Sequence, residues 1–113
     1  MSYTCCTPGC GNQLNPQGPI SMFVIHADNQ FALQLDVDDD SAKLTDSAVD
    51  AIQNALPGRP ATSQVMITSV GLVNGSQDNF TLSHDLLLRG NAPTSGTYTI
   101  CCRKCGKCCK YNY

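Results

Sequence analysis

The positions of the cysteines constrain this chain more than any other feature of its sequence. Eight cysteines lie near the two ends of the 113 residues, three within the first ten and five within the last thirteen: Cys5, Cys6, Cys10, Cys101, Cys102, Cys105, Cys108 and Cys109. The ninety residues from Gly11 to Ile100 contain none. Cross-links can therefore join the ends of the chain, whereas the middle must form a hydrophobic core of its own.

Six of the eight cysteines form adjacent pairs: Cys5-Cys6, Cys101-Cys102 and Cys108-Cys109. Neighbouring cysteines bridge each other only in a strained ring, because a disulfide favours Cα atoms about 5.5–6 Å apart. Adjacent side chains of a strand also point to opposite faces. Each pair is therefore predicted to send its thiols to different partners. If the three N-terminal thiols each pair with a C-terminal one, two of the five C-terminal thiols remain. We expect these two to close a small loop or to reach another chain, and the connectivity stays open.

The middle of the chain predicts strands and a single helix. A dense apolar run at 20–26 and alternating residues at 31–37 indicate a hairpin. Thr45 as an N-cap and an apolar stripe ending at Leu56 predict a helix over about 46–56. Further strands are predicted at 65–73, 80–88 and 97–101, with a loop at 89–96. The expected fold class is α+β: a mainly antiparallel β-sheet or sandwich of about five strands, in the order β-β-α-β-β-β.

These elements divide the chain into three parts. Residues 1–19 form an N-terminal cysteine segment and linker, residues 20–100 an α+β core domain, and residues 101–113 a basic, cysteine-rich tail. The tail holds four of the seven bases, namely Arg103, Lys104, Lys107 and Lys110, whereas the rest of the chain has nine aspartates against three bases. Such a tail attracts a neighbouring copy of the chain or nucleic acid, or it simply aids solubility.

No set of residues in the sequence indicates an enzyme. His26 and His84 fall on predicted strands, and neither has a cysteine, serine or paired carboxylate at a catalytic spacing. No apolar run approaches the ~20 residues of a membrane span, so no membrane partner is expected. The first residues lack the basic and apolar regions of a signal peptide, which predicts synthesis in the cytoplasm.

Two cysteine spacings resemble zinc-ribbon knuckles. Cys102-Arg103-Lys104-Cys105-Gly106 is a C-x-x-C-G turn, and Cys6-Thr7-Pro8-Gly9-Cys10-Gly11 is a looser C-x3-C version. If the fold sets them side by side, Cys6, Cys10, Cys102 and Cys105 would form a tetrahedral zinc site with four thiolate ligands. On this alternative hypothesis the chain is a small intracellular zinc-binding module that contacts nucleic acid or a protein partner.

The N-terminal sequence Tyr3-Thr4-Cys5-Cys6-Thr7-Pro8-Gly9-Cys10 resembles the N-terminal connector of spore-appendage subunits. In that family a cysteine pair and a third cysteine staple neighbouring β-domains together. Cysteine-rich head, neck and tail proteins of some robust phages use a similar arrangement. The resemblance implies a mode of assembly in which reactive ends join β-rich bodies.

The leading hypothesis from the sequence is therefore a non-catalytic structural subunit of a self-assembling particle, in particular a phage virion component such as a decoration, neck or tail protein. Its partners would be copies of itself and other structural proteins, and its final location a virion or extracellular particle. All eight cysteines would serve as cross-links without a cofactor. Zinc is the expected cofactor only in the alternative hypothesis.

Overall fold

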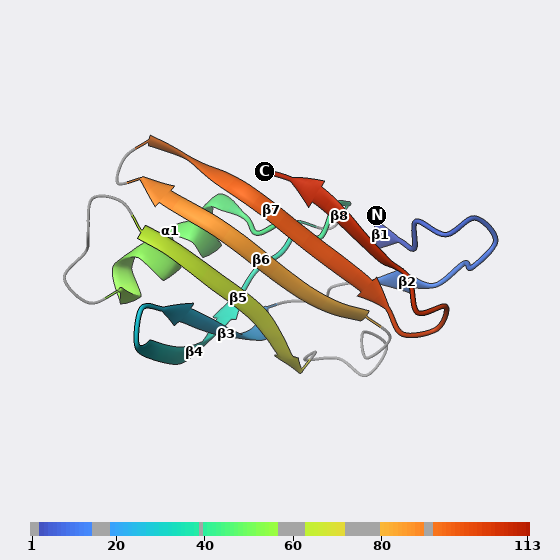
Figure 1. The fold of residues 1–113 in the computed structure, drawn as a ribbon, viewed down its shortest axis with the longest axis horizontal. Coiled ribbons are helices and arrows are strands. Elements are labelled where there is room, and N and C mark those ends of the chain that lie inside the picture. The colour runs from blue at the N-terminus through green and yellow to red at the C-terminus, as the bar shows by residue number, and fades with distance from the viewer. Residues whose placement is uncertain (1–2, 15–18, 39, 57–62, 72–79, 90–91) are drawn as a thin grey trace.

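The computed structural model describes residues 3–14, 19–38, 40–56, 63–71, 80–89 and 92–113. Within these ranges the chain forms eight strands and one helix (Figure 1). The elements are β1 (Tyr3–Thr4), β2 (Gln13–Leu14), β3 (Ile20–His26), β4 (Asn29–Leu35), α1 (Asp46–Ala55), β5 (Ser63–Gly71), β6 (Phe80–Arg89), β7 (Ala92–Cys102) and β8 (Cys108–Asn112).

Six of the strands form one antiparallel sheet in the order β4-β3-β5-β6-β7-β8. The short strands β1 and β2 pair with each other in a separate hairpin. The predicted antiparallel sheet with a single helix is confirmed. The predicted count of about five strands is wrong for this sheet, because a sixth strand, β8, follows the expected five. The described strands form one main sheet and a small hairpin rather than the two packed sheets of a sandwich.

Strand β8 lies in the segment that the sequence treats as a basic tail. Its side chains alternate, with Cys108, Lys110 and Asn112 exposed and Cys109 and Tyr111 half-buried. This is the period-two pattern of a strand with one face toward the core. The lysine and the cysteines conceal the pattern in the sequence, because neither residue type marks a strand by composition.

Strand β7 also begins earlier than the sequence indicates. The predicted loop at 89–96 includes residues that pair with β6, since Arg89 faces Ala92 and Leu86 faces Gly96. Gly96 has φ +150°, and a Cβ atom there would collide with the backbone carbonyl of Asp85. Glycine permits this close approach of the two strands, although in the sequence it reads as a loop former.

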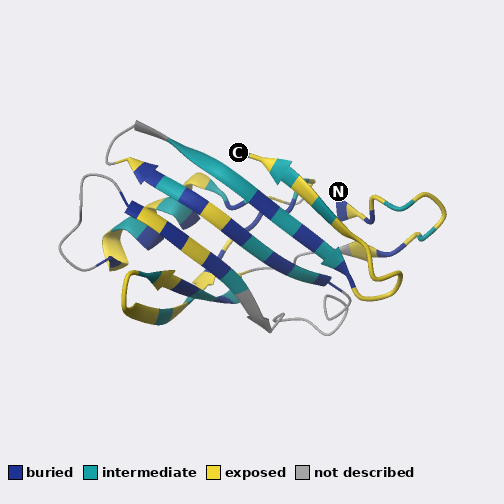
Figure 2. Ribbon diagram, in the orientation of Figure 1, coloured by how far each residue is buried: buried dark blue, intermediate teal, exposed yellow. Residues whose placement is uncertain are grey.

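Helix α1 covers one face of the sheet, and the core lies between them (Figures 1 and 2). Thr45 caps the helix, because its Oγ1 accepts a hydrogen bond from the backbone N–H of Ala48 at 3.3 Å. Ala48 and Ile52 then point inward, and both are buried. They face the alternating buried residues of the central strands, among them Ile20, Met22, Val24, Val65, Ile67, Leu82, Leu86 and Ile100. No helix in the described part of the chain has the length and apolar character needed to cross a membrane.

The turn between β3 and β4 carries local backbone strain. His26 pairs with Asn29, so that Ala27 and Asp28 alone form the turn, and Ala27 has φ +51°. Such two-residue hairpins require a positive φ, which glycine adopts freely and alanine does not. We predict that Ala27→Gly raises the free energy of unfolding by about 0.5–1 kcal/mol, measured by chemical denaturation.

The exposed Ala51 of α1 provides a matched control for this substitution. Alanine is not strained in the middle of a helix, so glycine relieves nothing there and only adds conformational freedom to the unfolded chain. Ala51→Gly should therefore lower the free energy of unfolding by about 1 kcal/mol. Equal losses in the two variants would show that the turn at Ala27 is not strained.

Candidate metal centre

The first half of the candidate site is the N-terminal hairpin. Tyr3 and Thr4 pair with Leu14 and Gln13, and the backbone N–H of Cys5 donates to the carbonyl of Asn12 at 2.8 Å. The intervening loop contains Gly9 at φ +81° and Gly11 at φ +71°. Because these glycines accept positive φ values, the loop folds back and brings Cys5 and Cys10 to the same side.

The second half is the turn between β7 and β8. Cys102 closes the turn, since its N–H donates to the carbonyl of Lys107 and its carbonyl accepts from the N–H of Gly106, both at 2.9 Å. Gly106 has φ +77°, which an L-residue with a side chain adopts at a cost. The C-x-x-C-G spacing therefore does form the tight turn expected of a knuckle.

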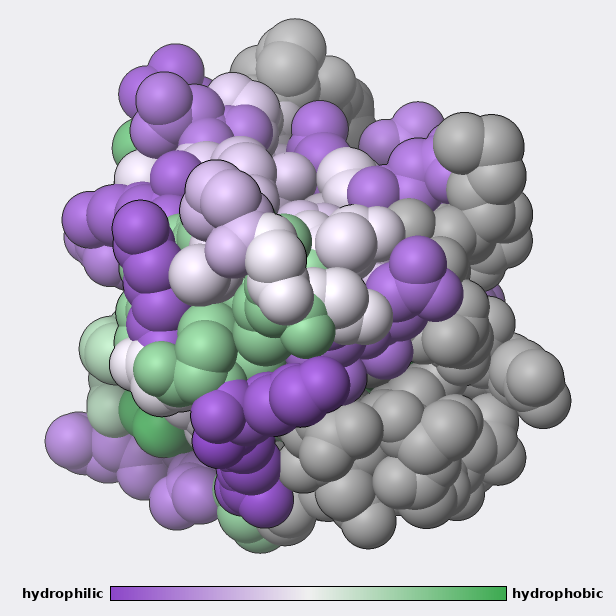
Figure 3. All heavy atoms as spheres, turned by 90° about the vertical axis from the view of Figure 1, so that its right-hand side faces the viewer, coloured by the Kyte–Doolittle hydropathy of each residue, from purple (hydrophilic) through white to green (hydrophobic). Residues whose placement is uncertain are grey.

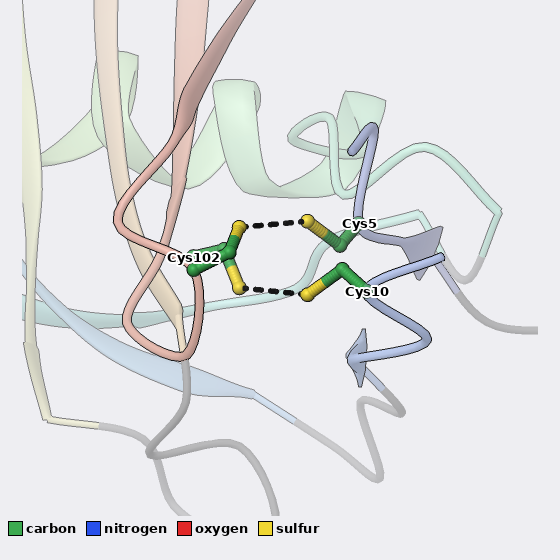
Figure 4. A group of neighbouring side chains, drawn as sticks. Cys5, Cys10 and Cys102 are labelled. Carbon is green, nitrogen blue, oxygen red and sulfur yellow. Dashed lines mark hydrogen bonds between the residues drawn. The ribbon is translucent and has the colours of Figure 1, made fainter. Parts of the chain in front are cut away.

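The two loops place four free thiols together at one end of the molecule. Cys5 Sγ lies 3.6 Å from Cys105 Sγ, and Cys10 Sγ lies 3.8 Å from Cys102 Sγ. All four sulfurs lie within 4.8 Å of one another. Figure 4 shows Cys5 and Cys10 pointing from the N-terminal loop toward Cys102 on the hairpin. Four sulfurs bound at ~2.3 Å to one tetrahedral ion are about 3.8 Å apart, so the cluster is close to the arrangement that zinc requires.

The ligand set differs from the predicted one at a single position. The structure brings Cys10, Cys102 and Cys105 together as expected, but Cys5 and not Cys6 completes the cluster. Cys6 instead forms a disulfide with Cys109 on β8. The sequence favours Cys6 because its spacing to Cys10 is nearer to that of a knuckle. In the fold, however, Cys5 follows the buried Tyr3 at an interval of two and points the same way.

Two further polar side chains, which the sequence does not single out, contact the thiols. The side-chain amide of Asn12 donates to Cys102 Sγ at 3.2 Å within the protein interior. Thr7 Oγ1 lies 3.4 Å from Cys105 Sγ. Hydrogen-bond donors around thiolate ligands hold them in place and offset their negative charge. Thr7 lies between Cys6 and Cys10 and Asn12 lies two residues after Cys10, and this closeness to the cysteines is the only signal for them in the sequence.

These contacts alter the acidity of the thiols. Burial opposes ionisation of Cys102, but hydrogen bonds from Asn12 and from the backbone N–H groups of Cys105 and Lys104 outweigh it and lower its pKa to about 6. The pKa of Cys105 is lowered chiefly by its contact with Thr7 and by the backbone N–H of Lys107. Cys102 is therefore largely a thiolate at neutral pH, the form that binds metal.

Cys10 has the opposite tendency. The backbone N–H of Asn12 lowers its pKa, but burial and hydrogen bonds with the other three thiols raise the net value to about 11. A Cys10 thiol can thus donate to the neighbouring Cys102 thiolate. A bound cation would replace this shared proton and release it to solvent.

The remaining four cysteines form two disulfides within the chain. Cys6 pairs with Cys109 across 103 residues of sequence, and Cys101 pairs with Cys108 across the β7–β8 hairpin. The two C-terminal thiols in excess do close a small loop. Each adjacent cysteine pair sends its two thiols to different partners, as the sequence predicts. The N-terminal hairpin is therefore tied to the last strands by one disulfide and by the thiol cluster.

The four bases of the predicted tail surround this end of the sheet. Arg103, Lys104, Lys107 and Lys110 are all exposed, and Lys104 Nζ donates to the carbonyl of Cys10 at 3.4 Å. Figure 3 views this end directly and shows a hydrophobic patch flanked by hydrophilic side chains. The positive charges offset the negative charge of a cluster of thiolates and favour its ionised form.

The aromatic side chains near the tail are engaged in packing. The hydroxyls of Tyr3 and Tyr111 lie 2.8 Å apart, and the Tyr111 ring stacks on Tyr98. Tyr113 accepts a hydrogen bond from the backbone N–H of Leu44. Tyr111 and Tyr113, both half-buried, therefore fix the end of the chain to the body.

The two histidines lie away from the cluster. His84 is buried on the core face of β6, where its Nδ1 and the Tyr113 hydroxyl share a hydrogen bond and its ring stacks on Tyr98. Burial lowers its pKa to about 4. His26 ends β3 beside the turn. His84 is therefore a buried residue of the sheet's core face.

The division of the cysteines predicts a simple alkylation result. Protein unfolded with a chelator but without a reductant should gain four alkyl groups, at Cys5, Cys10, Cys102 and Cys105, because the other four thiols are bonded to each other. Addition of a reductant should raise the number to all eight cysteines. Intact mass and peptide mapping measure both values. Addition of eight alkyl groups without a reductant would contradict the two disulfides. Addition of no alkyl group would contradict the four free thiols of the cluster.

Comparison with protein-family models, with curated proteins and with solved structures finds no significant match for this chain.

Proposed function

We propose that this chain is a small, non-catalytic zinc-binding module in which a tetrathiolate centre holds its two ends together. The observation that carries the proposal is the convergence of Cys5, Cys10, Cys102 and Cys105, whose sulfurs all lie within 4.8 Å of one another. These residues come from opposite ends of the sequence, so their meeting is a product of the fold. Four cysteine ligands are a complete donor set for structural zinc.

The donor set supports a structural role for the metal over a catalytic one. A catalytic zinc site keeps one position open for water or substrate, whereas four thiolates close the coordination sphere. Soft sulfur ligands in a tetrahedral arrangement favour zinc over magnesium, calcium or manganese, which prefer oxygen. Cys5 and Cys102 are buried, and Cys105 is exposed at the turn, so the centre would lie just beneath the surface.

The metal would couple the stability of the N-terminal hairpin to that of the sheet. The hairpin β1–β2 shares no ladder with the six-stranded sheet. Its links to the sheet include the Cys6–Cys109 disulfide, the contact between the Tyr3 and Tyr111 hydroxyls, and the thiol cluster with the hydrogen bonds around it. Because the free energy of metal binding at such a site contributes to folding, loss of the ion should loosen this end of the molecule first.

The cross-linked virion subunit remains a hypothesis with less support. All eight cysteines lie beside another cysteine of the same chain, four in disulfides and four in the cluster. A bridge to a second chain would have to break one of these pairs or take a thiol from the cluster. A nucleic-acid partner is also less favoured, because Tyr111 and Tyr113 are packed against the body.

Titration with Co²⁺ tests the proposal. The protein with its disulfides intact, freed of metal by a chelator, should bind one Co²⁺ per chain and develop the intense visible absorption of a tetrahedral thiolate complex. Equimolar Zn²⁺ should abolish that absorption, because zinc binds more tightly to a tetrahedral thiolate site. The weak spectrum of hydrated Co²⁺ throughout the titration would overturn the proposal.

A further inference from the structure

The two edges of the main sheet differ in what covers them. Strand β8 forms one edge, and the N-terminal segment is fastened to it through the Cys6–Cys109 disulfide and the pair of Tyr3 and Tyr111 hydroxyls. Strand β4 forms the other edge and pairs with β3 alone among the described strands. An open edge exposes backbone donors and acceptors that readily pair with another strand.

The register of the β3–β4 hairpin identifies the outward backbone groups. His26 and Asn29 close a two-residue turn, and the pairing continues to Ile20 and Leu35. In such a hairpin the closing pair is hydrogen-bonded, and successive pairs alternate between hydrogen-bonded and non-hydrogen-bonded. Gln30, Ala32 and Gln34 are therefore the residues of β4 whose N–H and C=O groups point away from β3.

The sequence of β4 is nearly symmetrical about Ala32. It reads Gln30-Phe31-Ala32-Leu33-Gln34, with one glutamine and one large apolar residue on each side of the central alanine. A two-fold axis through Ala32 would place Gln30 opposite Gln34 of a second copy, and Phe31 opposite Leu33. All the outward backbone groups would then meet a partner, because Ala32 faces Ala32 in a hydrogen-bonded pair.

Strand β4 also lacks the devices that usually protect an edge. Edge strands are commonly blunted by lysine, proline, a bulge or an inward charge. Residues Asn29 to Leu35 include no charged residue and no proline, and their pairing with β3 proceeds without a register shift. The nearest charges are Asp28 in the turn and Asp36 directly after the strand. A two-fold axis through Ala32 places Asp28 opposite Asp36 of the second copy at each end of the interface, outside the paired residues, and this repulsion opposes the pairing.

From these observations we propose that two copies of this chain associate by antiparallel pairing of their β4 strands about Ala32. The two six-stranded sheets then form one continuous sheet. Phe31 and Leu33, which pack against the core but remain partly exposed, gain an apolar cross-strand neighbour from the second copy. Gln30 and Gln34 meet on the opposite face, where their amides can hydrogen-bond.

The outer face of the sheet is the competing surface for a second copy. Ile25 and Met66 are neighbours across β3 and β5, and their side chains are 36% and 55% exposed. This pair is small and is flanked by polar side chains such as those of Gln64 and Asp85, which hydrogen-bond to each other at 2.8 Å. Substitutions can show which of the two surfaces mediates dimerisation, because Ala32 is on the edge strand and Met66 is on a central strand.

Sedimentation velocity of the metal-loaded chain across a range of concentrations tests the proposal. The wild type should shift from 12.1 kDa to twice that mass as the concentration rises. Ala32→Pro removes one outward N–H from each copy and should weaken dimerisation about tenfold or more, without removing a hydrogen bond to β3. Ala32→Lys tests the same edge through like-charge repulsion. Met66→Lys introduces the same charge on the outer face and should leave dimerisation unchanged.

Each alternative result would overturn the β4 pairing. A wild-type chain that stays monomeric leaves no dimer to explain, and a dimer lost in Met66→Lys but kept in both Ala32 variants assigns the interface to the outer face. A dimer that survives all three variants and denaturation without reductant assigns the link to cysteines. Circular dichroism of each variant should match the wild type, which separates lost pairing from lost folding.

Amide hydrogen exchange provides a residue-level measurement of the same interface. The amides of Gln30, Ala32 and Gln34 should become protected as the concentration rises, whereas those of Phe31 and Leu33 should be protected throughout. This proposal stands apart from the zinc proposal, since β4 contributes no residue to the thiol cluster. Concentration-independent exchange at Gln30, Ala32 and Gln34 in a dimeric sample would contradict the proposed pairing.

Discussion

Cys5→Ser should abolish stoichiometric zinc binding, whereas loss of Cys6 should leave it intact. The two residues are neighbours in the sequence, but only Cys5 Sγ lies in the cluster, 3.6 Å from Cys105 Sγ. A serine hydroxyl is a poor replacement for a thiolate ligand of zinc. We expect the dissociation constant for zinc to rise by more than about 100-fold in Cys5→Ser. Zinc competition with a chromophoric chelator measures it.

The matched control is the double variant Cys6→Ser/Cys109→Ser. It removes the disulfide between the N-terminal loop and β8 without leaving a spare thiol that could enter the cluster. Its zinc affinity should stay within about tenfold of the wild type, because the four ligands remain. Its free energy of unfolding should fall by about 2–5 kcal/mol with the loss of the disulfide. The assignment of Cys5 would be wrong if zinc were lost from the double variant and retained by Cys5→Ser.

The second large effect should appear in the dependence of stability on pH. His84 is 3% exposed, its Nδ1 shares a hydrogen bond with the Tyr113 hydroxyl, and its Nε2 has no hydrogen-bond partner among the residues that the structure describes. Burial lowers its pKa from 6.5 to about 4, so the folded chain holds this side chain neutral. Below pH 6.5 the His84 imidazole of the unfolded chain takes up a proton, and this proton must be released again when the chain folds. The contribution of His84 should therefore be constant above pH 7 and fall by about 3 kcal/mol as the pH is lowered to 4.

The comparison of wild type with His84→Leu isolates this effect. The thiol cluster also responds to acid, but it is present in both proteins, so its contribution cancels in the difference between their free energies of unfolding. That difference should shift by about 3 kcal/mol in favour of His84→Leu between pH 7.5 and pH 4. A difference between wild type and His84→Leu that does not change with pH would rule out the buried neutral state.

The core of the fold follows from local patterns in the sequence. The dense apolar run of β3 and the alternating apolar residues of β4 and β6 predict the strands, and Thr45 with the apolar positions Ala48 and Ile52 predicts the helix. These signals are strong because one face of each element is buried, which imposes a period of two or of about 3.6. The start of β7 and the whole of β8 lack such a signal. Gly96 reads as a loop former, and the bases and cysteines of β8 read as a tail.

The ligand set could be predicted only in part. The C-x-x-C-G turn at Cys102 and Cys105 is a local structure, and the sequence predicts it correctly. The choice between Cys5 and Cys6 depends on which of two adjacent side chains faces the β7–β8 turn. That orientation is set by the pairing of β1 with β2 and by the burial of Tyr3. Both strands are too short, and too far along the sequence from the β7–β8 turn, for cysteine spacing alone to predict it. The contacts of Asn12 and Thr7 with sulfur follow from the same packing.

Zinc K-edge X-ray absorption on the protein purified without added metal tests the central claim most directly. The proposed centre at Cys5, Cys10, Cys102 and Cys105 predicts one zinc per chain with four sulfur neighbours at ~2.3 Å and no nitrogen or oxygen in the first shell. The same measurement on Cys5→Ser should lose that shell. A substoichiometric metal content, or a first shell containing nitrogen or oxygen in the wild-type protein, would contradict the tetrathiolate centre.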